Sequence, residues 1–200
     1  LHDGHLSLVR LSQSKCDRTL VSIYVNPTQF NNAEDLAKYP NTLEADLQAL
    51  EMTGCDAVFL PDAQMLYPDG LKSRSFDFDG LDRYMEGAGR PGHFEGMATV
   101  VKRFFALIEP DIAVFGEKDY QQLRLIVNMV ESFFMSIKII SCKTIRTEDG
   151  LALSSRNSLL TAEERLIAPK FYDALKSKKS ISEIKKSLNN YGFKVEYVEV

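Results

Sequence analysis

Short apolar segments rich in β-branched residues recur along the first part of the chain. None of them alternates cleanly between apolar and polar positions, which is typical of strands buried on both faces of a parallel sheet. Four such segments are predicted as strands, at residues 19–25, 57–60, 112–115 and 137–141.

Helical patterns lie between these strands. The clearest has Asn41 as its N-terminal cap, Glu44 three residues later and Gly54 as its stop, which is the signature of a capped helix that ends at glycine. Two longer helices are predicted at 94–108 and 119–134. Strands that alternate with helices predict an α/β fold with an open, doubly wound (Rossmann-like) parallel sheet, in which ligands bind beyond the carboxyl ends of the strands.

The pattern changes after the fourth predicted strand. A polar stretch leads into a helix at 161–175, which opens with a Thr161/Glu164 capping box. A further short helix is predicted at 181–188, and the alternation of 193–197 predicts one strand. This second region is therefore predicted to be a small α+β domain.

The predicted domains are a Rossmann-like nucleotide-binding domain at 1–143 and a smaller C-terminal lid domain at 144–200. A single terminal strand has no partner for its backbone, and the first helix lacks the preceding strand that a phosphate-binding turn requires. We therefore expect both ends of the chain to be truncated.

Composition narrows the class of protein. Of the 200 residues 44% are hydrophobic, which is enough for a real core, and the net charge of −4 gives no attraction to nucleic acid or to anionic membranes. No apolar run approaches the roughly 18 residues of a membrane span. The three cysteines are widely separated, so we expect a reducing cytoplasm rather than a disulfide framework or a zinc site.

A glycine turn with two histidines opens the chain. His2, Gly4 and His5 precede a helical pattern. Glycine lets the backbone approach a ligand, a helix start supplies unpaired N–H groups, and two imidazoles can donate to a phosphate. Two surface histidines near a frayed end would explain this pattern equally well.

Polar residues also follow the first predicted strand. Asn26 and Gln29 stand in the segment NPTQF, where neutral donors and acceptors would suit a small carboxylate or hydroxyl substrate. An ordinary Asn-Pro turn is the simpler interpretation of this segment by itself. Asp46 could help to hold a hydrated Mg²⁺, although a carboxylate on a helix surface is again the simpler interpretation.

A glycine-rich loop precedes the helix at 94–108. It reads GAGRPGHFEG over 87–96 and contains Arg90 and His93, which could contact a carboxylate or a phosphate. Such a loop is either a lid or close backbone contact with a ligand, or else a mobile connector.

A charged turn follows the third predicted strand. Gly116, Glu117, Lys118 and Asp119 lead into a helix that bears Gln122. Lysine offers a point charge for phosphate, Asp119 could accept from ribose hydroxyls, and Gln122 lies one turn into the helix. A capped surface turn with Asp119 as its N-cap remains the alternative.

A compact row of donors begins the second region. Leu153 is followed by Ser154, Ser155 and Arg156, whose hydroxyls and guanidinium could hold a triphosphate and neutralise a departing pyrophosphate. The composition of this loop is common in proteins, so the loop alone does not indicate a phosphate site. It gains weight only together with the other segments. Several weak signals that follow consecutive strands are jointly stronger than any one of them.

The ordered segments HDGHLSLVR, VSIYVNPTQF, GRPGHFEGMATVV, FGEKDYQQL and RTEDGLALSSRN resemble the pantothenate synthetases, which are the pantoate–β-alanine ligases of vitamin B5 biosynthesis in the HxGH nucleotidyltransferase superfamily. The resemblance implies that the carboxylate of pantoate attacks the α-phosphorus of ATP with the help of Mg²⁺ and releases pyrophosphate. The amine of β-alanine then displaces AMP from the pantoyl adenylate. A homodimer is implied as well.

The resemblance also implies roles for individual residues. His5, His2, Lys118 and Arg156 would act in catalysis, with the histidines as hydrogen-bond donors to phosphate. Gln29 and Gln122 would hold pantoate, with Asn26 and Arg90 near the substrate end. The residues implied to bind ATP are His2, Gly4, His5, Gly116, Glu117, Lys118, Asp119, Ile145, Leu153, Ser154, Ser155 and Arg156.

Two other hypotheses remain open at this stage. The chain could be another HxGH nucleotidyltransferase of cofactor biosynthesis, which leaves the adenylyl group on its product, although the NPTQF and SSRN segments argue against this. It could also be a catalytically idle nucleotide-binding module.

Overall fold

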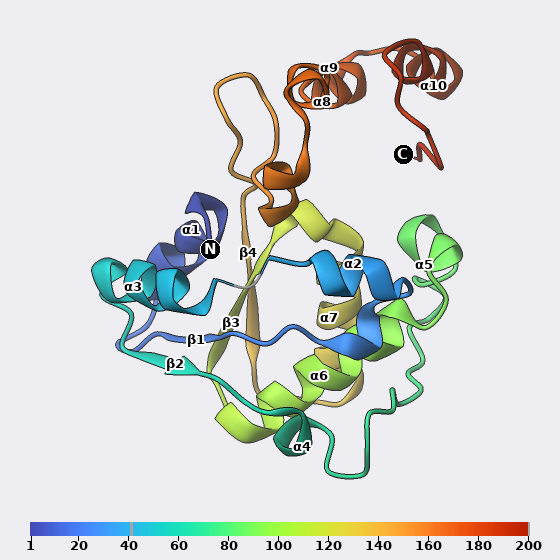
Figure 1. The fold of residues 1–200 in the computed structure, drawn as a ribbon. Coiled ribbons are helices and arrows are strands. Elements are labelled where there is room, and N and C mark those ends of the chain that lie inside the picture. Colours follow the sequence, from blue (N-terminus) through green and yellow to red (C-terminus); the bar gives the residue numbers. More distant parts are fainter. Residues whose placement is uncertain (41, 200) are drawn as a thin grey trace. The chain divides into compact units, whose positions relative to one another are not determined.

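The computed structural model describes residues 1–40 and 42–199 (Figure 1). The chain forms two compact units. The first comprises Leu1 and His5–Lys143, and the second comprises His2–Gly4 and the residues from Thr144 onward. The division of the chain into separate domains at 1–143 and 144–200 stays a prediction.

The first unit alternates helices with short strands. Its elements in chain order are α1 Asp3–Gln13, β1 Leu20–Ser22, the 3₁₀ turn η1 Pro27–Gln29, α2 Ala33–Lys38, α3 Leu43–Thr53, β2 Ala57–Phe59, α4 Ala63–Leu66, α5 Met85–Gly89, α6 His93–Ile108, β3 Ile112–Gly116, the 3₁₀ turn η2 Glu117–Asp119, α7 Tyr120–Ser132 and β4 Lys138–Cys142.

The four predicted strands are confirmed, and their pairing is parallel. β1 pairs with β2 in the register Leu20↔Ala57, and β3 pairs with β4 from Ile112↔Lys138 to Gly116↔Cys142. Figure 1 shows β3 and β4 side by side. Within the described residues the hydrogen bonds define these two pairs separately, so the fold is α/β with parallel strands, and a single doubly wound sheet remains a prediction.

The core of the first unit lies where α6 and α7 pack together. Leu125 and Ile126 of α7 are fully buried, and Met97 and Ala98 of α6 are nearly so. Partly buried side chains of both strands in the β3–β4 pair, Phe115 among them, pack against this cluster. Because β3 and β4 pack against this core, the point at which the chain leaves each of these strands is held in place.

The helix ends agree with most of the predicted signals. Gly54 ends α3 in the left-handed conformation, with φ of 75°, which glycine adopts without a steric penalty. The predicted cap Asn41 lies outside the described residues. Thr42 occupies the N-cap position of α3, and its side chain makes no capping hydrogen bond.

The second unit corrects two predictions. Its elements after the antiparallel bridge Arg146↔Ala152 are the 3₁₀ turn η3 Ser155–Leu159, α8 Ala162–Ile167, α9 Lys170–Lys176 and α10 Ile181–Asn190. The Thr161/Glu164 capping box is present. The single helix predicted at 161–175 is wrong, because Pro169 has no N–H to continue the ladder and the helix breaks there.

The predicted strand at 193–197 is also wrong, since these residues have no regular secondary structure. Their alternation instead reflects packing. Phe193 and Val195 lie against a small cluster that includes Ile184 and the fully buried Leu188 of α10. Alternating burial against helices gives the same sequence pattern as a strand, and no neighbouring strand among the described residues pairs with it.

Across residues 1–40 and 42–199, none of the helices combines the length and the apolar character needed to cross a membrane.

Candidate active site

A buried amide lies at the centre of the loop that follows β1. Asn26 is only 3% exposed. Its Nδ2 donates to the Gly96 carbonyl at 3.1 Å and to Gln29 Oε1 at 3.3 Å. Its Oδ1 accepts from Tyr67 Oη at 2.6 Å and from Thr28 Oγ1 at 3.1 Å. Both atoms of the amide are thus fully used inside the protein, so Asn26 holds its neighbours in place, and its predicted position near a substrate stays a prediction.

Tyr67 and Thr28 are site residues that the sequence did not predict. Tyr67, directly after α4, is 5% exposed, and its hydroxyl lies 2.9 Å from Thr28 Oγ1. Burial raises the pKa of Tyr67, so the phenol remains protonated. The available signal was a tyrosine at the edge of an apolar stretch, because a buried phenol usually has a hydrogen-bond partner.

Gly96 allows α6 to approach this loop closely. A Cβ atom at this position would lie 2.5 Å from the Thr28 carbonyl oxygen, which is well inside a van der Waals contact. No other residue can therefore occupy position 96 unless η1 or α6 moves. Gly96 of the glycine-rich segment thus makes a close backbone contact within the protein, and the lid or ligand contact predicted for this segment stays a prediction.

The backbone carbonyl of Gln29 is held from the same glycine-rich segment. His93 Nδ1 lies 2.7 Å from this oxygen and Arg90 Nη2 donates to it at 3.4 Å, while Arg90 Nη1 pairs with Glu86 at 3.2 Å. His93 is 8% exposed. Burial lowers its pKa, the Gln29 carbonyl partly offsets this, and the Arg90 charge lowers it further. The structure thus brings Arg90 to the Gln29 backbone, and its place near a substrate stays a prediction.

The two glutamines at the start of α7 lie in different environments. Gln121 donates to the carbonyls of Leu81 and Tyr84, each at 2.8 Å, and accepts from the Glu86 N–H at 3.1 Å. Gln121 therefore fixes the start of α5 and the residues just before it. Gln122, the predicted substrate ligand, is half-buried.

The turn after β3 carries exposed charged side chains. Lys118 and Asp119 are 42% and 63% exposed and lie 3.7 Å apart, while Glu117 accepts from Ser141 Oγ at 2.8 Å. A Cβ atom at Gly116 would meet nothing within 4 Å. Asp119 occupies the N-cap position of α7, but its side chain makes no capping hydrogen bond. The alternative interpretation, a turn capped by Asp119, therefore has the position but not the hydrogen bond.

The first helix is anchored beside the end of β4. Ser7 Oγ lies 3.5 Å from Cys142 Sγ, and Cys142 is the register partner of Gly116. This contact places the α1 segment that carries His5 near the carboxyl end of the β3–β4 pair. His5 is half-buried there.

Asp46, the predicted metal ligand, is engaged within the first unit. It accepts from Thr42 Oγ1 at 3.0 Å and forms an ion pair with the amino group of Leu1. Among residues 1–40 and 42–199 no group of three or more His, Cys, Asp or Glu side chains could hold a metal ion. A hydrated Mg²⁺ ion at Asp46 stays a prediction.

The opening turn explains the glycine between the two histidines. The Gly4 N–H donates to His2 Nδ1 at 3.1 Å, and a Cβ atom on Gly4 would lie 2.8 Å from the His2 ring and 3.5 Å from the Leu153 Cβ. Because a backbone N–H can only donate, Nδ1 is the accepting nitrogen, and the neutral ring carries its proton on Nε2. The turn thus makes the outer nitrogen of His2 a donor.

The Ser-Ser-Arg row extends from a short hairpin. The Leu153 N–H donates to the Ile145 carbonyl at 3.0 Å, and Ser154 Oγ accepts from the Arg156 N–H at 3.3 Å at the start of η3. Ser155 is half-buried and Arg156 is exposed. The second unit thus carries two serine hydroxyls and a guanidinium on consecutive residues.

Asp149 fastens the tip of this hairpin. Arg165 donates to its carboxylate at 2.6 Å, and Thr147 also donates to it. The Arg165 and Thr147 hydrogen bonds lower the pKa of Asp149 to about 2. Gly150 at the turn has φ of 92°, and Arg146 lies 3.5 Å from the centre of the Tyr172 ring. Asp149 and Arg146 thus have structural partners.

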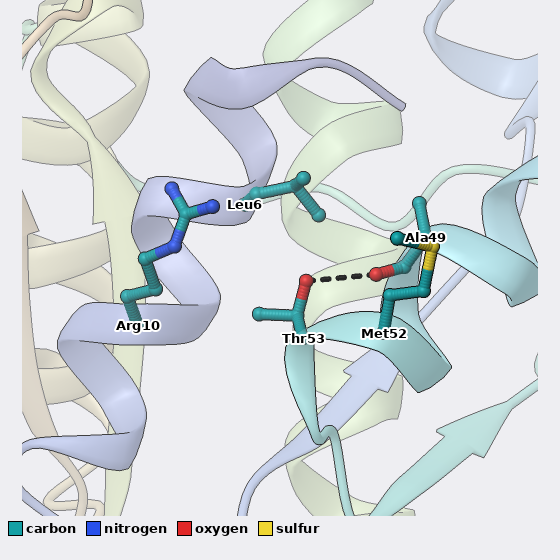
Figure 2. A pocket seen from close by; sticks show the side chains of 5 residues that line it. All are labelled: Leu6, Arg10, Ala49, Met52 and Thr53. Atoms are coloured by element: carbon teal, nitrogen blue, oxygen red, sulfur yellow. Dashed lines mark hydrogen bonds between the residues drawn. The ribbon is translucent and has the colours of Figure 1, made fainter.

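A hollow of about 390 Å³ lies on the first unit between α1 and α3 (Figure 2). The Thr53 hydroxyl in its wall donates to the Ala49 carbonyl at 2.7 Å. None of the predicted site residues lines this hollow. Its lining residues are Leu6, Arg10, Ala49, Met52 and Thr53.

The fold and these groups define a class of protein: an α/β protein with parallel strands that carries polar and charged side chains in the loops after them. The model of the pantoate-beta-alanine ligase family matches residues 1–200. The chain belongs to this family.

Curated relatives in this family are pantothenate synthetases. The chain is 54% identical over 170 residues to the one from Aeromonas hydrophila subsp. hydrophila, a match that covers 84% of this chain and 60% of the relative. It is 52% identical over 170 residues to the one from Vibrio parahaemolyticus, with 84% and 56% covered. The chain thus spans less than two thirds of the length of these relatives.

Solved structures agree with the family. The pantoate-beta-alanine ligase from Francisella tularensis, complexed with beta-gamma ATP and beta-alanine, is 42% identical with a TM-score of 0.94, and the match covers 100% of this chain and 77% of that one. The pantothenate synthetase from Thermus thermophilus is 41% identical with a TM-score of 0.87, covering 96% and 72%.

The contact at Gly96 gives a testable prediction. Gly96→Ala should destabilise the first unit by roughly 1–3 kcal/mol, because the new methyl group collides with the Thr28 backbone. The free energy of unfolding, measured with urea, checks this. Gly89→Ala is the matched control, since a Cβ atom there meets nothing within 4 Å. Equal stability of the two variants would contradict the account of the contact.

His93 gives a pH dependence. Its pKa is lowered from the ordinary value of 6.5, so below about pH 6.5 the unfolded chain binds more protons at this residue than the folded chain. Stability is therefore fully present above that pH and falls as the pH decreases toward the folded pKa. Urea unfolding at pH 8.0 and 5.5 measures this loss. In His93→Asn, whose amide can still donate to Gln29, the loss should be smaller, and an identical pH dependence in both proteins would refute the assignment.

Proposed function

We propose that this chain carries the ATP-dependent condensation of (R)-pantoate with β-alanine to pantothenate, through a pantoyl adenylate and with release of AMP and pyrophosphate. The match of residues 1–200 to the pantoate-beta-alanine ligase family carries the proposal. It is supported by a relative with a TM-score of 0.94 that was crystallised with an ATP compound and β-alanine.

On the first unit, the turn after β3 is proposed to bind ATP. Gly116 leaves its backbone open for close approach, and Glu117 is held by Ser141. Lys118 is exposed and offers its ammonium to phosphate, while Asp119 accepts from ribose hydroxyls. His5 donates to phosphate from α1.

On the second unit, His2 is proposed to donate to phosphate through Nε2, because Gly4 occupies its Nδ1. The hydroxyls of Ser154 and Ser155 and the guanidinium of Arg156 stabilise the charge that develops on pyrophosphate as it leaves. The backbone of Ile145 meets adenine. Leu153, joined to Ile145 by a backbone hydrogen bond, closes over the phosphates with the two serines and Arg156. The role of this unit as a lid is part of the same proposal.

Pantoate is proposed to lie at Gln29 and Gln122. The Gln29 backbone carbonyl makes hydrogen bonds with His93 and Arg90. These contacts fix the position of the backbone from which the Gln29 side chain projects. Arg90, which is paired with Glu86, and Asn26 lie near the substrate end. The Asn26 amide also donates a hydrogen bond to Gln29.

The chemistry needs no nucleophile from the protein. A carboxylate oxygen of pantoate attacks the α-phosphorus, the bond to the β-phosphate oxygen breaks, and pyrophosphate leaves. The amine of β-alanine then attacks the acyl carbon, the bond to the phosphate oxygen breaks, AMP leaves and the amine loses a proton. Because pantoate is ionised already, the histidines act by donating hydrogen bonds rather than by removing a proton.

Mg²⁺ is proposed as the metal that neutralises the triphosphate. The described residues contain no group of three or more His, Cys, Asp or Glu side chains that could hold a metal ion. This fits an ion bound mainly by phosphate and water, with Asp46 as its proposed protein ligand. Such an ion supplies positive charge beside the phosphate oxygens when bound.

A homodimer and a cytoplasmic location belong to the same proposal. All three cysteines, Cys16, Cys55 and Cys142, are free thiols, which agrees with a reducing compartment.

The function is tested by AMP formation in the presence of ATP, pantoate and β-alanine. Lys118→Ala should lower kcat/KM by about 100-fold or more, because a charge aimed at the transition state is lost. Lys72→Ala, at an exposed lysine outside the proposed site, is the control and should leave the rate unchanged. Pyrophosphate release that does not depend on pantoate, or a stable adenylylated product in the mass spectrum, would overturn the proposed function.

A further inference from the structure

The direction of the Asn26 amide is fixed by a group that can only accept. The Gly96 carbonyl lies 3.1 Å from one amide atom of Asn26, and a carbonyl oxygen has no hydrogen to donate. That atom must therefore be Nδ2. Oδ1 then faces the hydroxyls of Tyr67 and Thr28, and Tyr67, at 2.6 Å, is the shorter of its two contacts.

The orientation of the Gln29 side chain follows from that of Asn26. The second hydrogen of Asn26 Nδ2 points to a Gln29 side-chain atom at 3.3 Å, so the Gln29 atom that faces Asn26 is the acceptor Oε1. The NH₂ group of Gln29 is therefore turned away from Asn26. A chain of defined hydrogen-bond directions runs from the Tyr67 hydroxyl through Asn26 to the outer end of Gln29.

We propose that Tyr67, which holds the Asn26 amide together with the Gly96 carbonyl, is a positioning residue through which Gln29 presents its NH₂ group to an oxygen acceptor of the hydroxy acid substrate. The inference rests on the proposed function, in which Gln29 holds pantoate. It adds a rule of specificity: a carboxylate or hydroxyl oxygen is accepted at this point, and a group that can only donate is rejected because two donors would face each other.

Tyr24 supplies a matched control. Its side chain is half-buried and packs against the same core cluster as Tyr67. Its hydroxyl oxygen is buried and has no hydrogen-bond partner among the described residues. Tyr24→Phe therefore removes a similar phenolic hydroxyl without removing a link of the chain to Gln29.

The experiment compares Tyr67→Phe and Tyr24→Phe in the full chain. Pantoate affinity is measured by calorimetry, and kcat and the KM values for pantoate and ATP by AMP formation. Tyr67→Phe should weaken pantoate binding and raise its KM about tenfold, the effect of one lost buried hydrogen bond, with the KM for ATP unchanged. Tyr24→Phe should change neither KM. An unchanged pantoate KM in Tyr67→Phe, or an equal rise for pantoate and ATP, would overturn the inference.

A double-mutant cycle with Gln29→Glu separates positioning from a general loss of structure. Glutamate has two oxygens and no NH₂ group to orient, so Tyr67→Phe should add less than about a twofold change in that background. A further tenfold rise would contradict the inference. If Tyr67→Phe does not fold, Thr28→Val, which removes the other donor to Asn26, should raise the pantoate KM in the same direction, and no rise would overturn the inference.

Failure of the inference and failure of the proposed function give different results. If the unmodified chain binds pantoate and Tyr67→Phe binds it equally well, only the role of Tyr67 is refuted. If the unmodified chain does not bind pantoate, the proposed function is refuted and the inference falls with it.

Discussion

The buried amide of Asn26 is the interaction on which the first unit's polar site depends. It joins the loop after β1 to the start of α6 and to Tyr67, and all of its hydrogen-bonding capacity is used. Leaving one such buried group unpaired costs about 1–3 kcal/mol, so the loop has one strongly preferred conformation. Gly96 makes this arrangement possible because only the absence of a side chain lets α6 approach the Thr28 backbone. The rigid core of α6 and α7 thereby sets the position of Gln29.

Charge is arranged differently from these buried polar groups. Lys118, Asp119 and Arg156 are exposed, and an exposed ion pair such as Lys118 with Asp119 contributes little to stability. These charges are therefore better suited to a ligand than to holding the fold. Asp149 and Arg165 differ from these charges, because the short hydrogen bond between them stabilises a hairpin. In the proposed function, neutral amides therefore orient pantoate, and solvent-accessible charges bind the triphosphate.

The sequence predicts local features of this structure better than distant ones. The four strands, the Gly54 stop and the Thr161/Glu164 capping box follow from residues within a few positions of one another. The contact of Tyr67 with Asn26 joins residues 41 positions apart, and no periodic pattern encodes it. The wrong strand at 193–197 has the same origin, since alternation reports burial but not whether a second strand lies alongside. The burial of Asn26 could likewise not be read from the NPTQF segment, because two partners of its amide, Gly96 and Tyr67, lie on other segments.

The central claim is that the carboxylate of pantoate attacks the α-phosphorus of ATP on this chain. Pantoate labelled with oxygen-18 at both carboxylate oxygens tests it, with mass spectrometry of the products. If the acyl adenylate forms, the bridging oxygen leaves with AMP when β-alanine attacks, so AMP carries one labelled oxygen and pantothenate keeps the other. Unlabelled AMP, or label in inorganic phosphate or pyrophosphate, would contradict the claim.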